Sequence, residues 1–433
     1  MVLVKAMKGE YVQYLKLFFF SVYIFVLPIA HTAAIQSFSL VLFLLLLAIT
    51  DFKKVDFKNL LKIKWLLVIL FAFIVLAYLS LFYSIDIKAS LKEVNKELVR
   101  NVFVMIVVFL FFSIYSIDKI TPYIYSIITI LFIHTIINLY TWYLADFSFN
   151  VRTGGLLDGY INKGGGERFA IWTSFAISAS IAIFLYKNKF IGAMFFLLSI
   201  LSMFSTHTRA GYLAALCMVI LIAFATIKSR LIKVLTILFF IIFIIGVYLN
   251  SHNFSHRYNL KASNNYIALM KKAPNEMGKE YKKLNLDYSI SSRISMWKAA
   301  IIYSSNHPFE PTGYGRFLYG KNIVKLNSKE NQPFSVYSQV HNEFLGILFS
   351  LGIFGLMLFL SFWIYFLKKS YSLIKNNINN ATSMFGFTMF FGGIGFIVNL
   401  CFGSFFGDTE AKFFYMMFGI ILAISVKNCI KNF

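Results

Sequence analysis

Long apolar segments recur along the whole chain, and this recurrence restricts its fold more than any other feature. A helix that crosses the hydrocarbon core of a bilayer needs roughly 20 mostly apolar residues. Allowing for tilt, about twelve segments approach that length. They lie approximately at 14–33, 36–50, 65–84, 99–117, 122–143, 169–186, 190–205, 210–227, 232–249, 342–366, 382–402 and 411–426. The pattern predicts an all-α integral membrane protein with about twelve transmembrane helices.

The composition supports this fold class. Of the 433 residues, 59% are hydrophobic and 14% are charged. A soluble protein of this size could not cover so much apolar surface with so few charges. The 51 phenylalanines and 25 tyrosines fit lipid-facing and interfacial positions. The three cysteines lie in or beside apolar segments and match no disulfide or metal pattern.

The basic residues predict the orientation in the membrane. Lysine and arginine outnumber acidic residues by 41 to 18, which gives a formal charge of +23. Short basic connections such as Asp51–Lys64 alternate with other connections, so the positive-inside rule places both termini in the cytoplasm. Part of the excess can instead attract anionic substrates or lipid headgroups. Because the cations are scattered between spans, a nucleic-acid-binding domain is not expected. Lys5 and Lys8 lead into a first span long enough to be retained, so no cleavable signal peptide is expected.

The outer connections are longer and differ in character. Ala145–Arg168 contains the glycine-rich stretch "RTGGLLDGYINKGGGERF", typical of a flexible or tightly turning loop. The connection from Asn250 to Gln339 contains the amphipathic stretch "SSRISMWKAAIIYSS" and the turn "PFEPTGYGRF". Loops longer than about 15 residues are usually functional or disordered. We expect a folded periplasmic subdomain at 250–340, between transmembrane helices 1–9 (1–249) and 10–12 (341–433).

Two outer arginines are candidates for binding an anion. Arg209, in "FSTHTRAGYLA", lies in a short turn between two spans, where the positive-inside bias disfavours arginine. The alternative is an interfacial arginine that snorkels to the surface. Arg293, in "SSRISMWKAA", follows the candidate N-caps Ser291 and Ser292, and a capped helix start beside an arginine can hold an anion. The alternative is an ordinary solvated arginine. The planar guanidinium group fits phosphate oxygens through paired donors.

A histidine precedes the tenth span, in "VHNEFLGILFSLGIFGLMLFL". His341 is a candidate general base, and Asn342 or Glu343 can orient its ring. The alternative is an interfacial histidine without a role. His134, near the middle of the fifth span, is the one deep ionisable candidate, and we expect it to have a hydrogen-bonded packing role.

Other patterns narrow the chemistry. No pair or cluster of His, Asp or Glu with metal-ligand spacing is found on the outer side, so neither a metal nor a cofactor is expected. Few charges lie deep inside spans, which disfavours an ion-coupled transporter. The turn Gly313–Arg316 can bring backbone amides near a ligand but does not match a phosphate loop. Lys298, Arg316 and Arg168 are candidate phosphate or sugar contacts.

Together these motifs resemble the O-antigen ligase family of bacterial inner-membrane glycosyltransferases, a superfamily that includes O-antigen polymerases. His341-Asn342, followed after nine residues by "GIFG" from Gly352, is similar to the family's histidine motif. "STHTRAGYLA" is similar to its arginine turn at Arg209, and "SSRISMWKAA" to its Arg-x-x-x-Trp-x-x-Ala helix at Arg293.

Three further stretches resemble elements of the same family. "PTGYGRF" is similar to its Gly-x-Gly turn at Gly313 and Gly315, and "VRTGG" to an Arg-x-x-Gly element at Arg152. "SFFGDTEAKFFYMMFGIILA" is similar to its last periplasmic corner and final span. The ordered motifs cover the chain from roughly residue 150 to its end, and the first spans carry no specific signature.

The resemblance implies a metal-independent enzyme of the C-type membrane glycosyltransferase fold in a Gram-negative inner membrane. It would transfer a glycan from undecaprenyl diphosphate to a sugar of lipid A–core oligosaccharide at the periplasmic face, with inversion. His341 would then be the base, and Arg209 and Arg293 would neutralise the leaving diphosphate. The substrate contacts expected on this reading are Arg152, Arg316, Gly315, Asn342 and Lys298.

The same sequence features also fit other functions. An O-antigen polymerase would use the same donor and join it to another lipid-linked repeat. A protein-targeting oligosaccharyltransferase of the same superfamily is a further alternative. A lipid-linked oligosaccharide flippase would line a central cavity with cations and would not require one histidine. The candidate residues all lie on one predicted face, which favours an enzyme, and a purely structural membrane protein would not need the large loop.

Overall fold

The computed structural model describes residues 2–148, 151–157, 165–231, 233–236, 238, 241, 242, 245, 288–330 and 338–428. Within them no β-strand forms, and one isolated bridge joins Ile29 to Leu156. The α-helices are α1 (Val2–Val26), α2 (Ala33–Asp51), α3 (Lys64–Leu79), α4 (Ile87–Glu93), α5 (Arg100–Ile114), α6 (Ile117–Tyr143), α7 (Gly166–Tyr186), α8 (Lys189–Ser205), α9 (Arg209–Thr226), α14 (Tyr288–Asn306), α15 (Tyr319–Glu330), α16 (Glu343–Asn376), α17 (Asn380–Leu400) and α18 (Thr409–Asn428). The shorter elements are η1 (Phe52–Lys54), η2 (Phe57–Ile63), η3 (Ser80–Tyr83), the π-helix η4 (Val94–Val99) and η5 (Arg316–Leu318).

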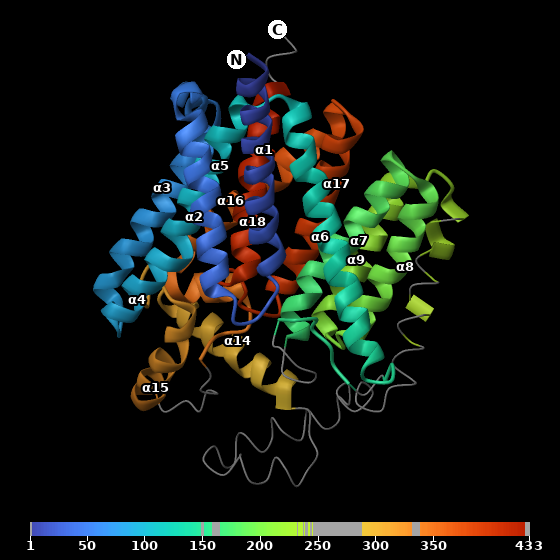
Figure 1. The fold of residues 1–433 in the computed structure, drawn as a ribbon. Helices are drawn as coiled ribbons and strands as arrows, with labels where there is room; N and C mark the ends of the chain where they lie inside the picture. The colour runs from blue at the N-terminus through green and yellow to red at the C-terminus, as the bar shows by residue number, and fades with distance from the viewer. Residues whose placement is uncertain are drawn as a thin grey trace.

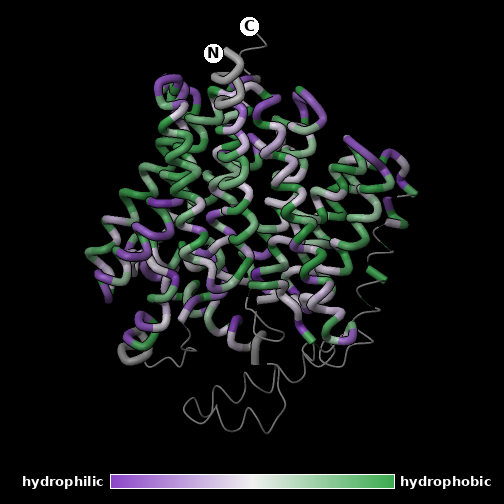
Figure 2. The backbone as a smooth tube through the Cα atoms, in the orientation of Figure 1, coloured by the Kyte–Doolittle hydropathy of each residue, from purple (hydrophilic) through white to green (hydrophobic). Residues whose placement is uncertain are grey.

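The helices form a bundle of the membrane-spanning kind. Among the described residues, 9 helices are long and apolar enough to cross a bilayer. Both chain termini lie at one end, which we call the terminal face, and α14 and α15 lie at the other end, the loop face (Figure 1). Hydrophobic residues dominate the middle of the bundle, and hydrophilic ones gather toward its ends (Figure 2). The prediction of an all-α membrane protein is confirmed.

The predicted count of twelve spans stays a prediction. The segment 232–249 lies largely outside the described residues, and α8 is apolar but, with 17 residues, shorter than any of the 9 spanning helices, which have at least 18. The division into 1–249, 250–340 and 341–433 likewise stays a prediction, because residues 251–287 of the large loop are outside the described part of the chain.

The helix α18 forms the centre of the bundle. In the most apolar 18-residue stretch of α18, 89% of the residues are buried, against 22% in that of the span Ala33–Lys54. It packs against α5 and α16, and its Phe414 ring lies 4.5 Å from both Trp363 and Phe366 of α16. Since α18 has protein on all sides while α2 exposes most of its surface, α2 faces lipid and α18 is the core.

The segment between the predicted spans 65–84 and 99–117 is helical. Asp86 caps α4 by accepting a hydrogen bond from the Ala89 backbone N–H at 2.9 Å. Helix α4 then continues through the π-turn η4 into α5, so the span runs from Ile87 to Ile114. Glu97, a charged residue of this segment, is buried among other elements instead of facing water.

A glycine bends α16 at the point where the large loop docks. Gly352 has φ 70° and ψ −170°, a left-handed conformation that favours glycine. The neighbouring Ile353 N–H donates to the Pro308 carbonyl at 3.0 Å, and a Cβ built on Gly352 would lie 2.8 Å from that same oxygen. The "GIFG" motif therefore shapes the helix and receives the segment after α14.

Helix α14 packs on the loop-face end of α16. Its buried residues Met296, Ala299 and Ala300 form a small apolar cluster with Val340 and Phe349. Arg293 precedes Met296 by three residues and so lies on the same side of α14. This docking carries Arg293 toward the segment that contains His341.

Candidate active site

The start of α7 is packed against two other segments of the loop face. A Cβ built on Gly166 would lie 2.7 Å from the Thr206 carbonyl oxygen and 3.1 Å from that of Thr153. Only glycine leaves room for this approach. The first turn of α7 therefore contacts both the residues beside Arg152 and the turn that precedes Arg209.

Asn138 of α6 ties the glycine-rich loop to the end of α8. Its amide nitrogen donates to Ser202 and Ser205, at 2.8–3.1 Å, and its carbonyl oxygen accepts from the Gly155 backbone N–H at 2.7 Å. The Thr153 backbone N–H also donates to the Ser205 carbonyl at 3.0 Å. These buried bonds fix the loop residues 151–157 against the helices that carry the site.

Glu167, in the first turn of α7, joins two of the predicted arginines. Its Oε1 accepts a hydrogen bond from Nη2 of Arg293 at 3.0 Å, and Nη2 of Arg152 lies 3.9 Å from the same oxygen. The three side chains are partly buried, with 19–32% of their surface exposed. Charged groups shielded to this degree interact more strongly than fully solvated ones.

His341 stands beside this group in a strained backbone conformation. Its φ is 53°, which is uncommon for a residue other than glycine. Val340 before it is buried against α14, and Asn342 after it caps α16 by accepting a hydrogen bond from the Leu345 N–H at 3.0 Å. The chain is thus held on both sides of the histidine, and retained strain of this kind is typical of functional positions.

The charges around His341 favour its neutral form. Burial lowers the pKa of His341, and the positive charge of Arg293 lowers it further, while the Glu167 carboxylate raises it in part. The net direction is downward from the ordinary value of 6.5. A neutral imidazole at neutral pH can accept a proton.

Neither neighbour that was expected to orient the ring does so through a hydrogen bond that the structure shows. The carbonyl oxygen of Asn342 is used in the helix cap, and Oε2 of the buried Glu343 accepts from the Phe406 backbone N–H at 3.2 Å. The charged side chains that act on His341 are Arg293 and Glu167. Glu343 belongs to the first turn of α16, and its side chain is buried in the bundle. Its direction is set by that helix and not by its sequence neighbour His341.

Arg209 begins α9 and is half-buried on the same face. The turn before it is braced by the Tyr212 hydroxyl, which donates to the Phe204 carbonyl at 2.7 Å. Through Thr206 this turn contacts the start of α7 at Gly166. Arg209 therefore lies on a segment that adjoins the Glu167 group.

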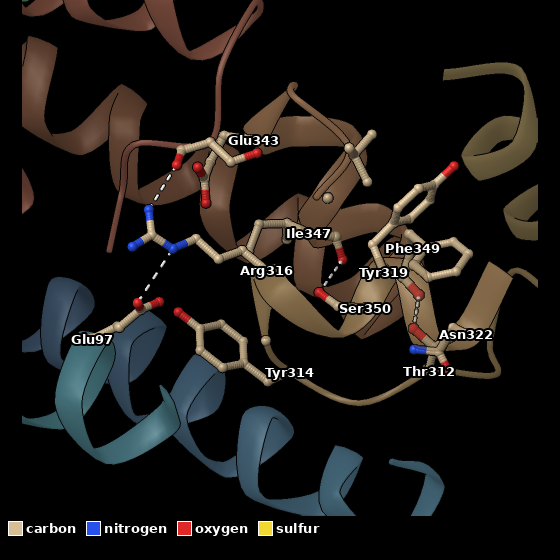
Figure 3. A pocket seen from close by; sticks show the side chains of 14 residues that line it. Glu97, Thr312, Tyr314, Arg316, Tyr319, Asn322, Glu343, Ile347, Phe349 and Ser350 are labelled. Carbon is tan, nitrogen blue, oxygen red and sulfur yellow. Dashed lines mark hydrogen bonds and ion pairs between the residues drawn. The ribbon is translucent and has the colours of Figure 1, made fainter. Parts of the chain in front are cut away.

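Arg316 belongs to a second, more buried charge cluster on the loop face. Its Nη atoms donate to both carboxylate oxygens of Asp408 at 2.7 and 2.8 Å, and its Nε lies 3.4 Å from Glu97 Oε1. Nη1 also donates to the Ser404 carbonyl at 2.8 Å. Figure 3 shows the Arg316 side chain between Glu97 and Glu343. Burial raises the pKa of Asp408, but the hydrogen bonds and the positive charge of Arg316 lower it by more, so the net pKa lies below the ordinary value.

Arg168 extends the same cluster. Its Nη2 donates to the Thr409 hydroxyl at 2.7 Å, and its guanidinium group contacts the buried Glu410 at 3.2–3.4 Å. Arg168 and Arg316 thus bind protein carboxylates, in contrast to the predicted phosphate or sugar contacts. Sequence spacing could not show these pairs, because the partners come from the distant "GDTE" corner.

The pocket in Figure 3 is too narrow for a sugar. It is lined by Gly315, Arg316, Glu97 and Glu343 among others, and its volume is about 20 Å³. A site of that size holds about one water molecule. Gly315 has φ 150°, and a Cβ there would lie 2.9 Å from Leu318 and 3.0 Å from Glu93, so it serves the turn itself. Lys298 is exposed on α14.

Ionisable groups away from the site have structural partners. His134 lies with Nε2 2.8 Å from the Phe25 carbonyl, as expected for a packing role. On the terminal side, the buried Lys16 contacts Asp51 at 2.5 Å, and the Tyr115 hydroxyl donates to the same carboxylate at 2.7 Å. Sequence spacing could not show this ion pair, because Lys16 lies in α1 and Asp51 at the end of α2. In the described part of the chain no group of three or more His, Cys, Asp or Glu is arranged to hold a metal ion.

Fold and site together define a multi-pass membrane protein whose loop face carries arginines, a carboxylate and a histidine. Residues 194–360 match the family model described as O-antigen ligase, and this match confirms the resemblance to the O-antigen ligase family. The matched part contains Arg209, Arg293, Arg316 and His341, whereas Arg152 and Glu167 precede it. The family match supports activity of the O-antigen ligase or polymerase type. No curated protein matches the chain.

Proposed function

We propose that the protein is an O-antigen ligase that transfers a glycan from undecaprenyl diphosphate to a sugar of lipid A–core oligosaccharide. The observation that carries the proposal is the cluster of Arg152, Glu167 and Arg293 beside His341. This cluster unites a group able to accept a proton with groups able to bind a diphosphate. On this reading the loop face is periplasmic, in a bacterial inner membrane, and both termini are cytoplasmic.

The reaction needs activation of an acceptor hydroxyl. The hydroxyl oxygen attacks the anomeric carbon of the donor sugar, and the bond from that carbon to the phosphate oxygen breaks. Undecaprenyl diphosphate leaves with the electron pair, and the hydroxyl proton passes to the imidazole of His341. Single displacement of this kind inverts the anomeric centre. The lowered pKa of His341 supports the role, because the ring is neutral before the reaction.

The leaving diphosphate gains charge as the bond breaks, and the arginines can neutralise it. With Arg209, Arg152 and Arg293 against Glu167, the formal charge of the group is three positive minus one negative, or +2. Helices α7, α9 and α16 all begin on this face, so the positive ends of their backbone dipoles add to the field. Removing one such preorganised donor costs roughly 10²–10³ in rate in comparable sites.

The donor's geometry fits a site at the membrane surface. The polyprenyl chain can stay among lipids while the diphosphate lies at headgroup depth, where the helix starts meet water. Both substrates are then reached from one face, which the resemblance also implies. The remaining predicted contacts lie elsewhere or have partners in the protein: Asn342 caps a helix, Gly315 serves its own turn, Arg316 is paired with protein groups, and Lys298 is solvent-exposed.

The test uses a host that lacks its own O-antigen ligase. Wild type, His341→Ala, Arg209→Ala and Arg293→Ala are added back, with Lys375→Ala at the end of α16 on the terminal face as a control. Membrane levels of each variant are measured on the same samples. The proposal expects a lipopolysaccharide ladder with wild type and control, and bare lipid A–core with accumulated lipid-linked glycan in the three site variants.

Two other outcomes would contradict the proposal. If the wild-type chain restores no ladder there but restores chain length in a polymerase-deficient host, the acceptor is another lipid-linked repeat. If all three site variants restore the ladder as wild type does, the cluster is not the catalytic site.

A further inference from the structure

Glu167 contacts two predicted site residues and acts on a third, although no motif singled it out. Its Oε1 lies 3.0 Å from Nη2 of Arg293 and 3.9 Å from Nη2 of Arg152. Its charge also acts on His341. One carboxylate thereby connects a loop, a helix of the large loop and the segment before α16.

We propose that Glu167 is a positioning residue, which holds the guanidinium groups of Arg293 and Arg152 beside His341 in the orientation that receives the donor's diphosphate. The proposal rests on the proposed function and adds a residue to it. Glu167 itself does not contact the reacting atoms.

The geometry of the ion pair supports this role. A guanidinium group has five N–H donors, and the hydrogen bond from Arg293 to Glu167 uses one of them. The bond fixes one side of the planar group and directs the other donors away from the carboxylate. An arginine held in this way loses little side-chain freedom when an anion binds, which favours binding.

Glu167 is itself held by its position in the fold. The adjoining Gly166 is packed against the carbonyl oxygens of Thr206 and Thr153, so the first turn of α7 has little freedom to move. An acidic side chain in the first turn is also favoured by the helix dipole. The carboxylate is therefore a fixed point from which the longer arginine side chains are oriented.

Glu167 also balances the charge at His341. The titratable and charged groups facing the imidazole are Arg293 from α14 and Glu167 from α7, and Arg152 reaches the site through Glu167. Arg293 and burial disfavour the imidazolium, whereas Glu167 favours it. Without the carboxylate the base would be harder to protonate, and the two arginines would repel each other.

The experiment compares Glu167→Gln and Glu167→Asp in the full-length purified protein in nanodiscs. Gln keeps an oxygen acceptor and removes the charge, while Asp keeps the charge and shortens the reach. Glu310→Gln is the matched control, because Glu310 is an exposed acid of the large loop that pairs with His307. Transfer is measured with undecaprenyl-diphosphate glycan and lipid A–core, as kcat and donor KM over a range of pH.

The proposal expects Glu167→Gln to lower kcat/KM by at least about tenfold, as for other losses of positioning. The acid limb of its pH profile should move to lower pH, because removing the negative charge lowers the pKa of His341. Glu167→Asp should keep the acid limb in place and recover part of the rate. Glu310→Gln should match wild type.

Histidine NMR of the same samples gives a readout that does not depend on turnover. The His341 signal is assigned by its loss in His341→Ala, and its titration should move to lower pH in Glu167→Gln.

If transfer by wild type is robust but rate, KM and titration are unchanged in Glu167→Gln, the positioning role is overturned and the proposed function stands. If Glu167→Gln is inactive while His341→Ala retains activity, Glu167 is itself the base, and the positioning role fails. If wild type transfers no glycan, the proposed function fails, and an unchanged titration in Glu167→Gln would then overturn the role of Glu167 as well.

Discussion

Glu167 and Arg293 are 126 residues apart in the chain, and Nη2 of Arg293 lies 3.0 Å from Oε1 of Glu167. The pair joins the first turn of a transmembrane helix to the helix α14 of the large loop. Because α14 also packs against Val340, the residue before His341, the pair and His341 form one unit. The contact that docks α14 of the large loop on the bundle is therefore also the contact that brings the residues of the candidate site together.

The first prediction concerns the guanidinium group of Arg293. Arg293→Ala should lower kcat/KM by roughly 10²-fold or more, because it removes a fixed donor from the position proposed for the leaving diphosphate. Arg293→Lys should recover only part of the rate, since an ammonium group lacks the planar pair of donors. The measurement is glycan transfer by purified protein at saturating acceptor.

Lys298→Ala is the control for the Arg293 series, since Lys298 lies on the same helix with an exposed side chain. It should change the rate by less than the arginine variants do. Equal losses at both positions would mean that general positive charge, and not the fixed guanidinium group, supports the reaction.

The second prediction is the pH dependence of transfer. The base must be neutral, and the pKa of His341 lies below its ordinary value, so kcat/KM should hold from neutral pH down past about 6.5 and fall only at lower pH. A profile of kcat/KM against pH measures this limb. A limb at or above 6.5, or one that persists in His341→Gln, would assign it to another group.

The sequence predicted the fold better than it predicted the contacts of the site. Apolar length and periodicity depend on local sequence, so the helices could be located without the structure. Arg293 and His341 could be chosen because an arginine or histidine at a helix start on the outer side is chemically informative. Glu167 could not be ranked, because its significance depends on the packing of three distant segments. Its one signal was its place directly after the three glycines of "GGGERF".

The same limit applies to contacts that residue type or sequence adjacency suggested. Arg316 has the residue type of an anion-binding group, yet Asp408 lies within hydrogen-bond distance in the folded chain. Glu343 is adjacent to His341 in sequence, yet its side chain contacts the Phe406 backbone. Sequence adjacency and residue type do not specify which charges meet, because tertiary packing selects the partners.

The third prediction tests the close packing at the start of α7. A methyl group at Gly166 would lie 2.7 Å from the Thr206 carbonyl oxygen, a contact that backbone must move to relieve. Gly166→Ala should therefore lower stability by about 1–3 kcal/mol and also lower transfer, because it displaces Glu167. Thermal unfolding in detergent and glycan transfer are measured on the same preparations.

Gly346→Ala in α16 is the matched control, since a Cβ there meets nothing within 4 Å. In a helix interior alanine is favoured over glycine by about 1 kcal/mol, so this variant should be as stable as wild type or more so. If the two variants behaved alike, the contact between α7 and Thr206 would not be tight in the protein.

The fourth prediction separates the buried charge cluster from the catalytic site. Arg316 pairs with Asp408 through two hydrogen bonds of 2.7 and 2.8 Å, and only 11% of its side-chain surface is exposed. Arg316→Met should destabilise the protein by roughly 3 kcal/mol, because it removes the cation that is hydrogen-bonded to Asp408 and paired with Glu97, and leaves Asp408 only the more distant Arg168. Adding Asp408→Leu to this variant should recover part of the lost stability, whereas this second substitution would not restore the activity of a residue required for catalysis.

The pair of Lys321 and Asp86, 2.6 Å apart, provides the control, and Lys321→Ala should change the unfolding temperature little. If Arg316→Met were as stable as wild type but inactive, Arg316 would act on substrate, and the structural role assigned to it here would be wrong.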